Sequence, residues 1–101
     1  MKAIVIDPYS ERIEYREISR EELDEICGGI AAPHWIVPHC LPGNVGYVDL
    51  NGLVDSKKQW FICNVHIWGT LVVVGKNDTD VQCSLEEVKK RVKFKWLDST
   101  K

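Results

Sequence analysis

The first third of the chain alternates between apolar and charged positions in a way that predicts two strands. Residues 2–7, KAIVID, form a short apolar run that ends at Asp7-Pro8. Such a run before a turn signal is typical of a buried strand. Residues 12–18, RIEYREI, alternate apolar and charged side chains, as a half-exposed strand does. We therefore expect these two strands to pair with each other.

The next segment, SREELDEICGG, predicts a helix from Arg20 to Cys27. Ser19 and Glu22 have the spacing of a capping box, in which each side chain accepts a hydrogen bond from the other residue's backbone N–H. Apolar residues recur on one side of the segment, and the Gly-Gly pair that follows can adopt the left-handed conformation that ends a helix.

Residues 30–44, IAAPHWIVPHCLPGN, contain three prolines. Proline interrupts a helix and cannot donate within a central strand, so this segment predicts no helix. We expect at most an edge strand around Trp35 to Val37, followed by a loop.

Residues 45–75 predict the remaining strands. The segment VGYVDLNGLV alternates around Asn51-Gly52, the strongest short-range signal for a hairpin turn. The segment QWFICNVHIWGTLVVVG then supplies one or two strands, and we interpret Trp60 to Val74 as extended.

The last predicted element begins at a second capping box, formed by Ser84 and Glu87. A helix to Lys90 follows from the apolar spacing. Residues 91–97 fit either a continued helix or a strand, because their aromatic residues alternate with lysines.

Together these elements predict one α+β domain over residues 1–101, with a small, mostly antiparallel sheet of about five strands and two helices packed on one face. The chain has 101 residues, of which 45% are hydrophobic and 28% charged, the balance of a globular domain with one core. Its formal net charge is −2, so no overall basic field attracts nucleic acid or membranes.

The cysteine count is even, but nothing else indicates a secreted protein. The first apolar run is too short for a signal peptide, and no run is long enough to span a bilayer. We expect a cytoplasmic protein with no membrane association and with four free thiols rather than disulfides. The cysteines are Cys27, Cys40, Cys63 and Cys83.

The pair Cys63-x-x-His66 has the spacing of half a zinc site. In an extended strand, however, residues three apart point to opposite faces of the sheet. No second pair repeats the spacing, so we expect no metal site and no cofactor. Cys40 with His39 and Asp49 could supply a catalytic triad, but a chain with so many Cys and His residues contains such combinations by chance. The sequence therefore favours a protein that is not an enzyme.

Two segments carry binding signals. The proline-rich segment presents Trp35 between His34 and His39, and we expect Trp35 to be the exposed tryptophan of a partner-binding surface. The basic segment KKRVKFKW interleaves cations with aromatic residues, which is the pattern of a nucleic-acid contact. The cations of this alternative site are Lys89, Lys90, Arg91, Lys93 and Lys95.

The order of several short motifs resembles a small uncharacterised domain family of bacteriophage and mobile-element proteins. The motifs are KAIVIDP, EELDEICGG, VDLNGL, IWGTLVVVG and SLEE. The resemblance matches Asp49 and Asn64 to polar positions of the family pattern, so Asp49 joins the expected partner-binding residues. It implies a small accessory protein encoded by a phage or mobile element, and it implies no activity.

The leading hypothesis is a non-enzymatic accessory protein that binds an unidentified protein partner, and the alternative is a nucleic-acid-binding protein. A small Cys/His metalloprotein ranks third. An open sheet edge, expected in so small a domain, would also allow a homodimer.

Overall fold

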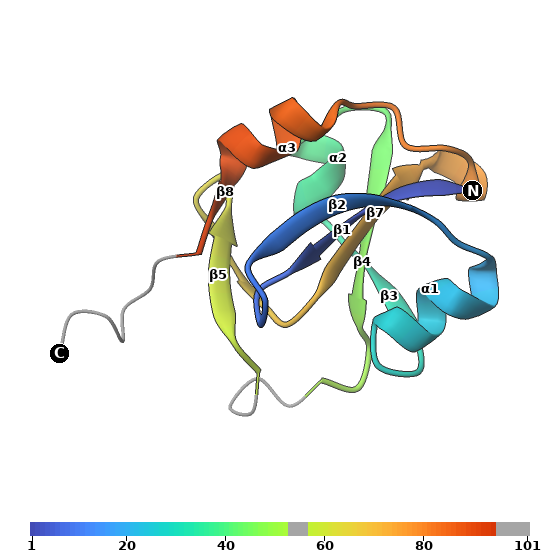
Figure 1. Cartoon of the computed structure of the whole chain (residues 1–101), viewed down its shortest axis with the longest axis horizontal. Coiled ribbons are helices and arrows are strands. Elements are labelled where there is room, and N and C mark those ends of the chain that lie inside the picture. Colours follow the sequence, from blue (N-terminus) through green and yellow to red (C-terminus); the bar gives the residue numbers. More distant parts are fainter. Residues whose placement is uncertain (53–56, 95–101) are drawn as a thin grey trace, which may run out of the picture.

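Two antiparallel sheets organise the chain, which the computed structural model describes over residues 1–52 and 57–94 (Figure 1). The main sheet has five strands in the order β2-β1-β7-β4-β3, and the second sheet has three in the order β6-β5-β8. The strands are β1 (Lys2–Asp7), β2 (Arg12–Glu17), β3 (Ala31–His34), β4 (Asn44–Asp49), β5 (Gln59–Ile62), β6 (Val65–Trp68), β7 (Leu71–Gly75) and β8 (Val92–Lys93). The helices are α1 (Arg20–Ile26), α2 (Ile36–Cys40), the 3₁₀ turn η2 (Lys76–Asp78) and α3 (Leu85–Arg91). The predicted α+β class and antiparallel sheet are confirmed.

Strands β1 and β7 lie inside the main sheet and are covered on both of its faces. Ala3 and Val5 belong to a core cluster with residues of α1, whereas Ile4 and Ile6 belong to a cluster with α2, α3 and the second sheet. The two predicted helices therefore lie on opposite faces of the main sheet rather than on one face. The uninterrupted apolar runs in β1 and β7 are the reason, because a strand buried on both faces needs a layer on each side.

Both capping boxes form as the sequence predicts. Ser19 and Glu22 exchange hydrogen bonds of 3.1 and 2.9 Å with each other's backbone N–H at the start of α1. Ser84 and Glu87 do the same at the start of α3, at 3.1 and 3.2 Å. The predicted helices are thus confirmed, and α3 ends at Arg91. Glu87 and Arg91, although four residues apart on α3, form no ion pair in the described part of the chain, because the Glu87 carboxylate is engaged in the capping box.

The proline-rich segment differs from the prediction. The edge strand is β3, which ends before Trp35, and the residues after it form the short helix α2. Pro38 lies in the first turn of α2, where backbone N–H groups have no intrahelical acceptor, so its missing N–H costs nothing there. Helix α2 also packs closely on β4, since a Cβ on Gly46 would collide with the side chain of Val37. The prediction that prolines forbid a helix was wrong for this reason.

The two-residue hairpin lies at Cys63-Asn64, between β5 and β6, and not at Asn51-Gly52. Cys63 and Asn64 both have positive φ, 51° and 65°, as a turn of the I′ type requires. The prediction that the chain is extended from Trp60 to Val74 was therefore wrong. After Asn51, the chain leaves the main sheet, because β4 pairs with β3 and β7 and the following strand β5 belongs to the second sheet.

A disulfide joins Cys40, at the end of α2, to Cys63 in the hairpin turn. Their Cα atoms are 6.4 Å apart, within the usual range for a bridge. The prediction of four free thiols was therefore wrong, and Cys27 and Cys83 are the free cysteines. The bridge connects α2, which packs on the main sheet, to the second sheet.

None of the helices in the described part of the chain is long and apolar enough to cross a membrane. The sequence left open whether residues 91–97 continue the helix or form a strand. In the structure α3 ends at Arg91, and β8 and then Phe94 follow it. The remaining residues of this segment lie outside the described ranges. Lys95 is among those.

Candidate functional site

Trp35 projects from the end of β3 and is the most exposed large hydrophobic residue of the described chain, with 62% of its surface accessible. It stacks on His34 with ring centroids 5.9 Å apart and an interplanar angle of 22°. Its other neighbour is His39 of α2, in an edge contact at 5.9 Å. We call these three residues the aromatic surface. Three of the four predicted partner-binding residues thus lie together, and the indole is held in place although it is exposed.

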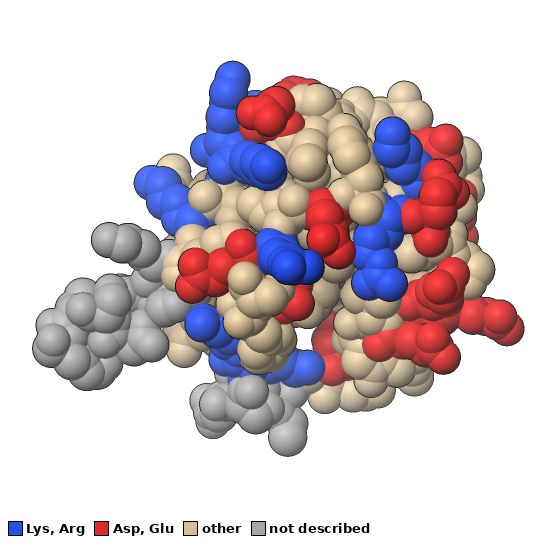
Figure 2. All heavy atoms as spheres, viewed as in Figure 1, with Lys and Arg blue, Asp and Glu red and all other residues tan. Residues whose placement is uncertain are grey.

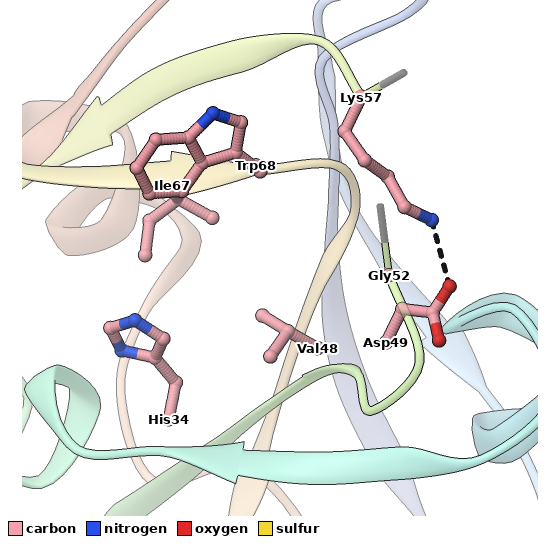
Figure 3. Close-up of a pocket in the computed structure, with 7 residues that line it drawn as sticks. All are labelled: His34, Val48, Asp49, Gly52, Lys57, Ile67 and Trp68. Atoms are coloured by element: carbon pink, nitrogen blue, oxygen red, sulfur yellow. Dashed lines mark hydrogen bonds and ion pairs between the residues drawn. The ribbon is translucent and has the colours of Figure 1, made fainter. Parts of the chain in front are cut away.

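A pocket adjoins the aromatic surface at His34 and lies between the two sheets (Figure 3). Its volume is about 120 Å³. His34 lies on one side of it and Trp68 on the other, and the space-filling view is hollowed between the sheets (Figure 2). The lining residues are His34, Val48, Asp49, Gly52, Lys57, Ile67 and Trp68. Asp49, the fourth predicted residue, therefore lines this pocket.

Asp49 and Lys57 form an ion pair at one end of the pocket (Figure 3), with Nζ 2.7 Å from Oδ2. Their side chains are only 15% and 22% exposed. The hydrogen bond from Lys57 lowers the pKa of the Asp49 carboxyl below its ordinary value of 3.8, although burial acts in the opposite direction. The backbone N–H of Asn51 also donates to this carboxylate and lowers its pKa further. Each charge is thus satisfied within the chain, so the pocket has an apolar body and one neutralised polar end.

The end of α1 lies close to this carboxylate. Gly28 has φ of +106°, which few residues other than glycine adopt, and a Cβ placed on it would lie 2.5 Å from Oδ2 of Asp49. The Gly-Gly stop predicted from the sequence therefore ends the helix and also makes room for Asp49.

His34 is neutral in this arrangement. The backbone N–H of Ile36 donates to its Nδ1 at 3.3 Å, so that nitrogen acts as an acceptor and carries no proton. Burial lowers the pKa of His34 below its ordinary value of 6.5. The same hydrogen bond holds the first turn of α2 against the end of β3.

We expect the burial of His34 to make the stability of the protein depend on pH. Below pH 6.5 the unfolded chain binds a proton at His34 before the folded chain does, so stability falls as the pH falls toward the folded pKa. Replacing His34 by Asn keeps an acceptor near the Nδ1 position but removes the titration. Melting temperatures measured across this pH range should therefore decline more steeply for the wild type than for His34→Asn. Parallel declines would show that His34 does not contribute.

The cysteines offer no activated nucleophile. Cys40, the one cysteine that the sequence placed in a conceivable triad, is bridged to Cys63 and has no thiol. Burial raises the pKa of Cys27 to about 12 and also raises that of Cys83, so both are poor thiolates at neutral pH. The residues near Cys40 therefore do not support nucleophilic catalysis.

The pair Cys63 and His66 does not form half of a metal site. The sulfur of Cys63 is in the disulfide, and the His66 ring lies between Phe61 and Trp68, at centroid distances of 4.6 and 4.4 Å. Within residues 1–52 and 57–94, no three His, Cys, Asp or Glu side chains are grouped so as to hold a metal ion.

Basic residues gather at the end of α3 and in β8, and acidic ones gather over α1 (Figure 2). Lys89, Lys90 and Lys93 are exposed there. Arg91 is half-buried, and its guanidinium donates to the carbonyl oxygen of Glu87 at 3.0 Å. The lysines of α3 lie at a helix C-terminus, where cations stabilise the helix itself. The structure thus gives these residues a role that requires no nucleic acid.

Sequence reasoning missed Lys57, which precedes β5, and the pocket residues Ile67 and Trp68 of β6. No local signal marks them, because the pocket forms only when the end of β4 meets β6 across the two sheets. His34 and Trp35 could be found, since an aromatic residue among prolines is exposed more often than one inside a strand.

The chain was also compared with known proteins. No family model matches it, and neither a curated protein nor a solved structure matches it significantly. The resemblance to the phage and mobile-element family therefore stays a prediction that rests on the order of the motifs.

Proposed function

We propose that this chain is a non-enzymatic accessory protein that binds a protein partner through the aromatic surface and the adjoining pocket. The observation that carries the proposal is the exposed indole of Trp35, which His34 and His39 hold in place beside a preformed pocket. Tryptophan is the residue most enriched among those that dominate binding energy, and a fixed ring loses little entropy when it binds.

The pocket indicates what kind of group the partner inserts. Its volume of about 120 Å³ is comparable to the roughly 150 Å³ of an engineered cavity that holds benzene, so one apolar side chain fits. Val48, Ile67 and the ring of Trp68 provide apolar contacts. A charged group is disfavoured, because Asp49 and Lys57 already neutralise each other. The partner would thus present an apolar side chain next to a surface on which Trp35 packs.

The origin and location of the protein also belong to this proposal. The family resemblance supports a phage or mobile-element source. A cytoplasmic location is the simplest expectation for such a protein, but disulfides persist mainly in oxidising compartments. In a reducing cytoplasm Cys40 and Cys63 would be thiols. Alkylation of the protein in intact cells, followed by a count of modified cysteines, distinguishes the two states.

Photo-crosslinking tests the proposed surface and identifies the partner. p-Benzoylphenylalanine at position 35 keeps an aromatic group there, and the same residue at position 30 is a matched control, because Ile30 is similarly exposed, 52%, at the opposite end of β3. We expect a discrete protein to be captured from position 35 in the native host and not from position 30. Equal capture from both positions, or no capture from position 35, would contradict the proposal.

The nucleic-acid alternative predicts a different result. Binding through Lys89, Lys90 and Lys93 would fall steeply as salt increases, because each phosphate contact releases counterions. A gel shift at low salt that detects no complex with single- or double-stranded probes would remove this alternative.

A further inference from the structure

Strand β2 is an edge of the main sheet, and its hydrogen-bonding pattern can be worked out from the register. Met1 and Ile18 exchange two hydrogen bonds, of 2.8 and 2.9 Å. The antiparallel register continues without interruption from Lys2–Glu17 to Asp7–Arg12. Since hydrogen-bonded and non-hydrogen-bonded pairs alternate, the backbone groups of Ile13, Tyr15 and Glu17 point away from β1. None of the hydrogen bonds among the described residues uses these outward N–H groups.

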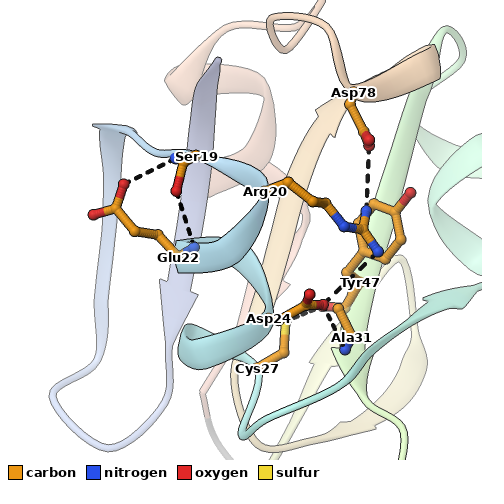
Figure 4. A network of polar contacts seen from close by, with 8 residues as sticks. All are labelled: Ser19, Arg20, Glu22, Asp24, Cys27, Ala31, Tyr47 and Asp78. Atoms are coloured by element: carbon orange, nitrogen blue, oxygen red, sulfur yellow. Dashed lines mark hydrogen bonds and ion pairs between the residues drawn. The ribbon is translucent and has the colours of Figure 1, made fainter.

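The opposite edge of the sheet is closed to a further strand. By the same alternation, Ala31 and Pro33 of β3 direct their backbone outward, because Leu50 donates to the oxygen of Ile30 at 2.8 Å. The N–H of Ala31 is used by Oδ1 of Asp24 at 3.0 Å, and Pro33 has no N–H (Figure 4). No backbone donor is therefore left on this edge. Strand β6, with four residues, presents fewer outward donors than β2, with six.

On the face of the main sheet against which α1 packs, the side chains of β2 alternate between positive and negative charge. Arg12, Glu14 and Arg16 lie opposite Asp7, Val5 and Ala3 of β1. All three are exposed, and none forms an ion pair within the described chain. Both signs of charge mix over β2 in the space-filling view (Figure 2). Charged residues usually protect an edge strand, but an alternating series can also match a second copy of itself.

We propose that two copies of this chain pair through β2, antiparallel about a two-fold axis that passes between the two Tyr15 residues. In this register Tyr15 faces Tyr15 and Ile13 faces Glu17, and these outward-pointing pairs form about six hydrogen bonds. Glu14 of each copy then faces Arg16 of the other, in the non-hydrogen-bonded position where side chains approach most closely.

Charge and hydrogen-bond number together select this register. A shift that places Glu14 opposite Glu14 also places Arg12 opposite Arg16, so both contacts are repulsive, and it forms fewer hydrogen bonds. A shift that places Arg16 opposite Arg16 is repulsive at its centre. Tyr15 is already fixed for the contact, because its hydroxyl accepts from the N–H of Leu85 at 2.9 Å and Lys2 lies over its ring at 4.3 Å.

The second copy continues the main sheet and leaves the aromatic surface free, since Trp35 follows β3 at the other edge. Dimerisation therefore goes beyond the proposed function, and each can fail without the other. A dimer formed by one strand pair buries a small area, so the association should be weak and should depend on concentration.

Sedimentation equilibrium of the full chain tests the pairing. We expect the wild type to dimerise as its concentration rises. The variant Arg16→Glu turns both attractive Glu14–Arg16 contacts of the dimer into repulsive contacts between two carboxylates. It should therefore raise the dimer dissociation constant about thirtyfold. Glu14→Arg should do the same, and the double variant Glu14→Arg/Arg16→Glu should restore the wild-type constant. Glu25→Arg, an equal change of charge at an exposed position of α1, is the control and should have no effect.

Melting temperatures will show whether each variant folds, and within residues 1–52 and 57–94 these exposed side chains form no ion pair that the substitutions would break. A wild type that stays monomeric at all attainable concentrations would overturn the proposal, as would an Arg16→Glu protein that dimerises normally. A double variant that fails to recover would overturn the register. Amide exchange gives a second measurement: the N–H groups of Ile13, Tyr15 and Glu17 should exchange more slowly as the concentration rises, and unchanged rates would contradict the pairing.

Discussion

Replacing Cys40 and Cys63 together by serine should lower the free energy of unfolding by about 3 kcal/mol. The bridge closes a loop with a sequence separation of 23 residues, and a crosslink over that distance removes much of the conformational freedom of the unfolded chain. It also joins α2 to the hairpin between β5 and β6. The N–H of Cys63 also donates to the carbonyl oxygen of Arg91 at 3.0 Å, which joins the hairpin turn to the end of α3 rather than to α2.

Denaturant unfolding with and without a reducing agent measures this loss. The wild type should lose stability on reduction, and the double serine variant should be insensitive to the reducing agent. Cys83→Ser is a suitable control, because this half-buried thiol is free in the structure. A wild type whose midpoint is unchanged by complete reduction would show that the bridge contributes nothing to stability.

Replacing Trp35 by Ala should weaken partner binding about a hundredfold, or about 2.7 kcal/mol. The side chain is mostly exposed in the free protein, so its removal leaves no cavity and should barely change the melting temperature. The partner would lose the largest apolar contact of the surface. His34 would lose its stacking neighbour next to the pocket.

Titration calorimetry with the captured partner gives the dissociation constants. Ile30→Ala is the matched control, since it removes a comparably exposed apolar side chain beyond the other end of β3. It should bind like the wild type. Equal losses for the two variants would mean that binding follows general surface hydrophobicity rather than the aromatic surface.

The sequence could predict those features of the fold that depend on neighbouring residues. Ser19 with Glu22, and Ser84 with Glu87, define their helix starts through contacts three residues apart. The apolar run of β1 is equally local. Features that depend on distant residues could not be predicted. Four cysteines allow several pairings, and only the meeting of α2 with the hairpin turn selects Cys40 and Cys63.

The turn at Asn51-Gly52 shows how tertiary structure overrides a local signal. Asn-Gly favours a tight hairpin, yet β4 already has partners on both edges, β3 and β7, so the chain cannot fold back to pair with it. The hairpin instead forms at Cys63-Asn64, where asparagine tolerates the left-handed conformation.

The candidate site was predictable to a similar extent. The proline-rich segment indicated Trp35 and its histidine neighbours, which are close in sequence. The pocket beside them needed the second sheet, and nothing near Lys57 or Trp68 in the sequence indicates that these residues face His34.

Hydrogen exchange of the protein with and without its captured partner tests the central claim most directly. The account predicts slower exchange in residues 33–41 and at the pocket residues of β4 and β6 when the partner is bound, with no change in β8. Unchanged exchange in residues 33–41, or protection confined to α3 and β8, would contradict it.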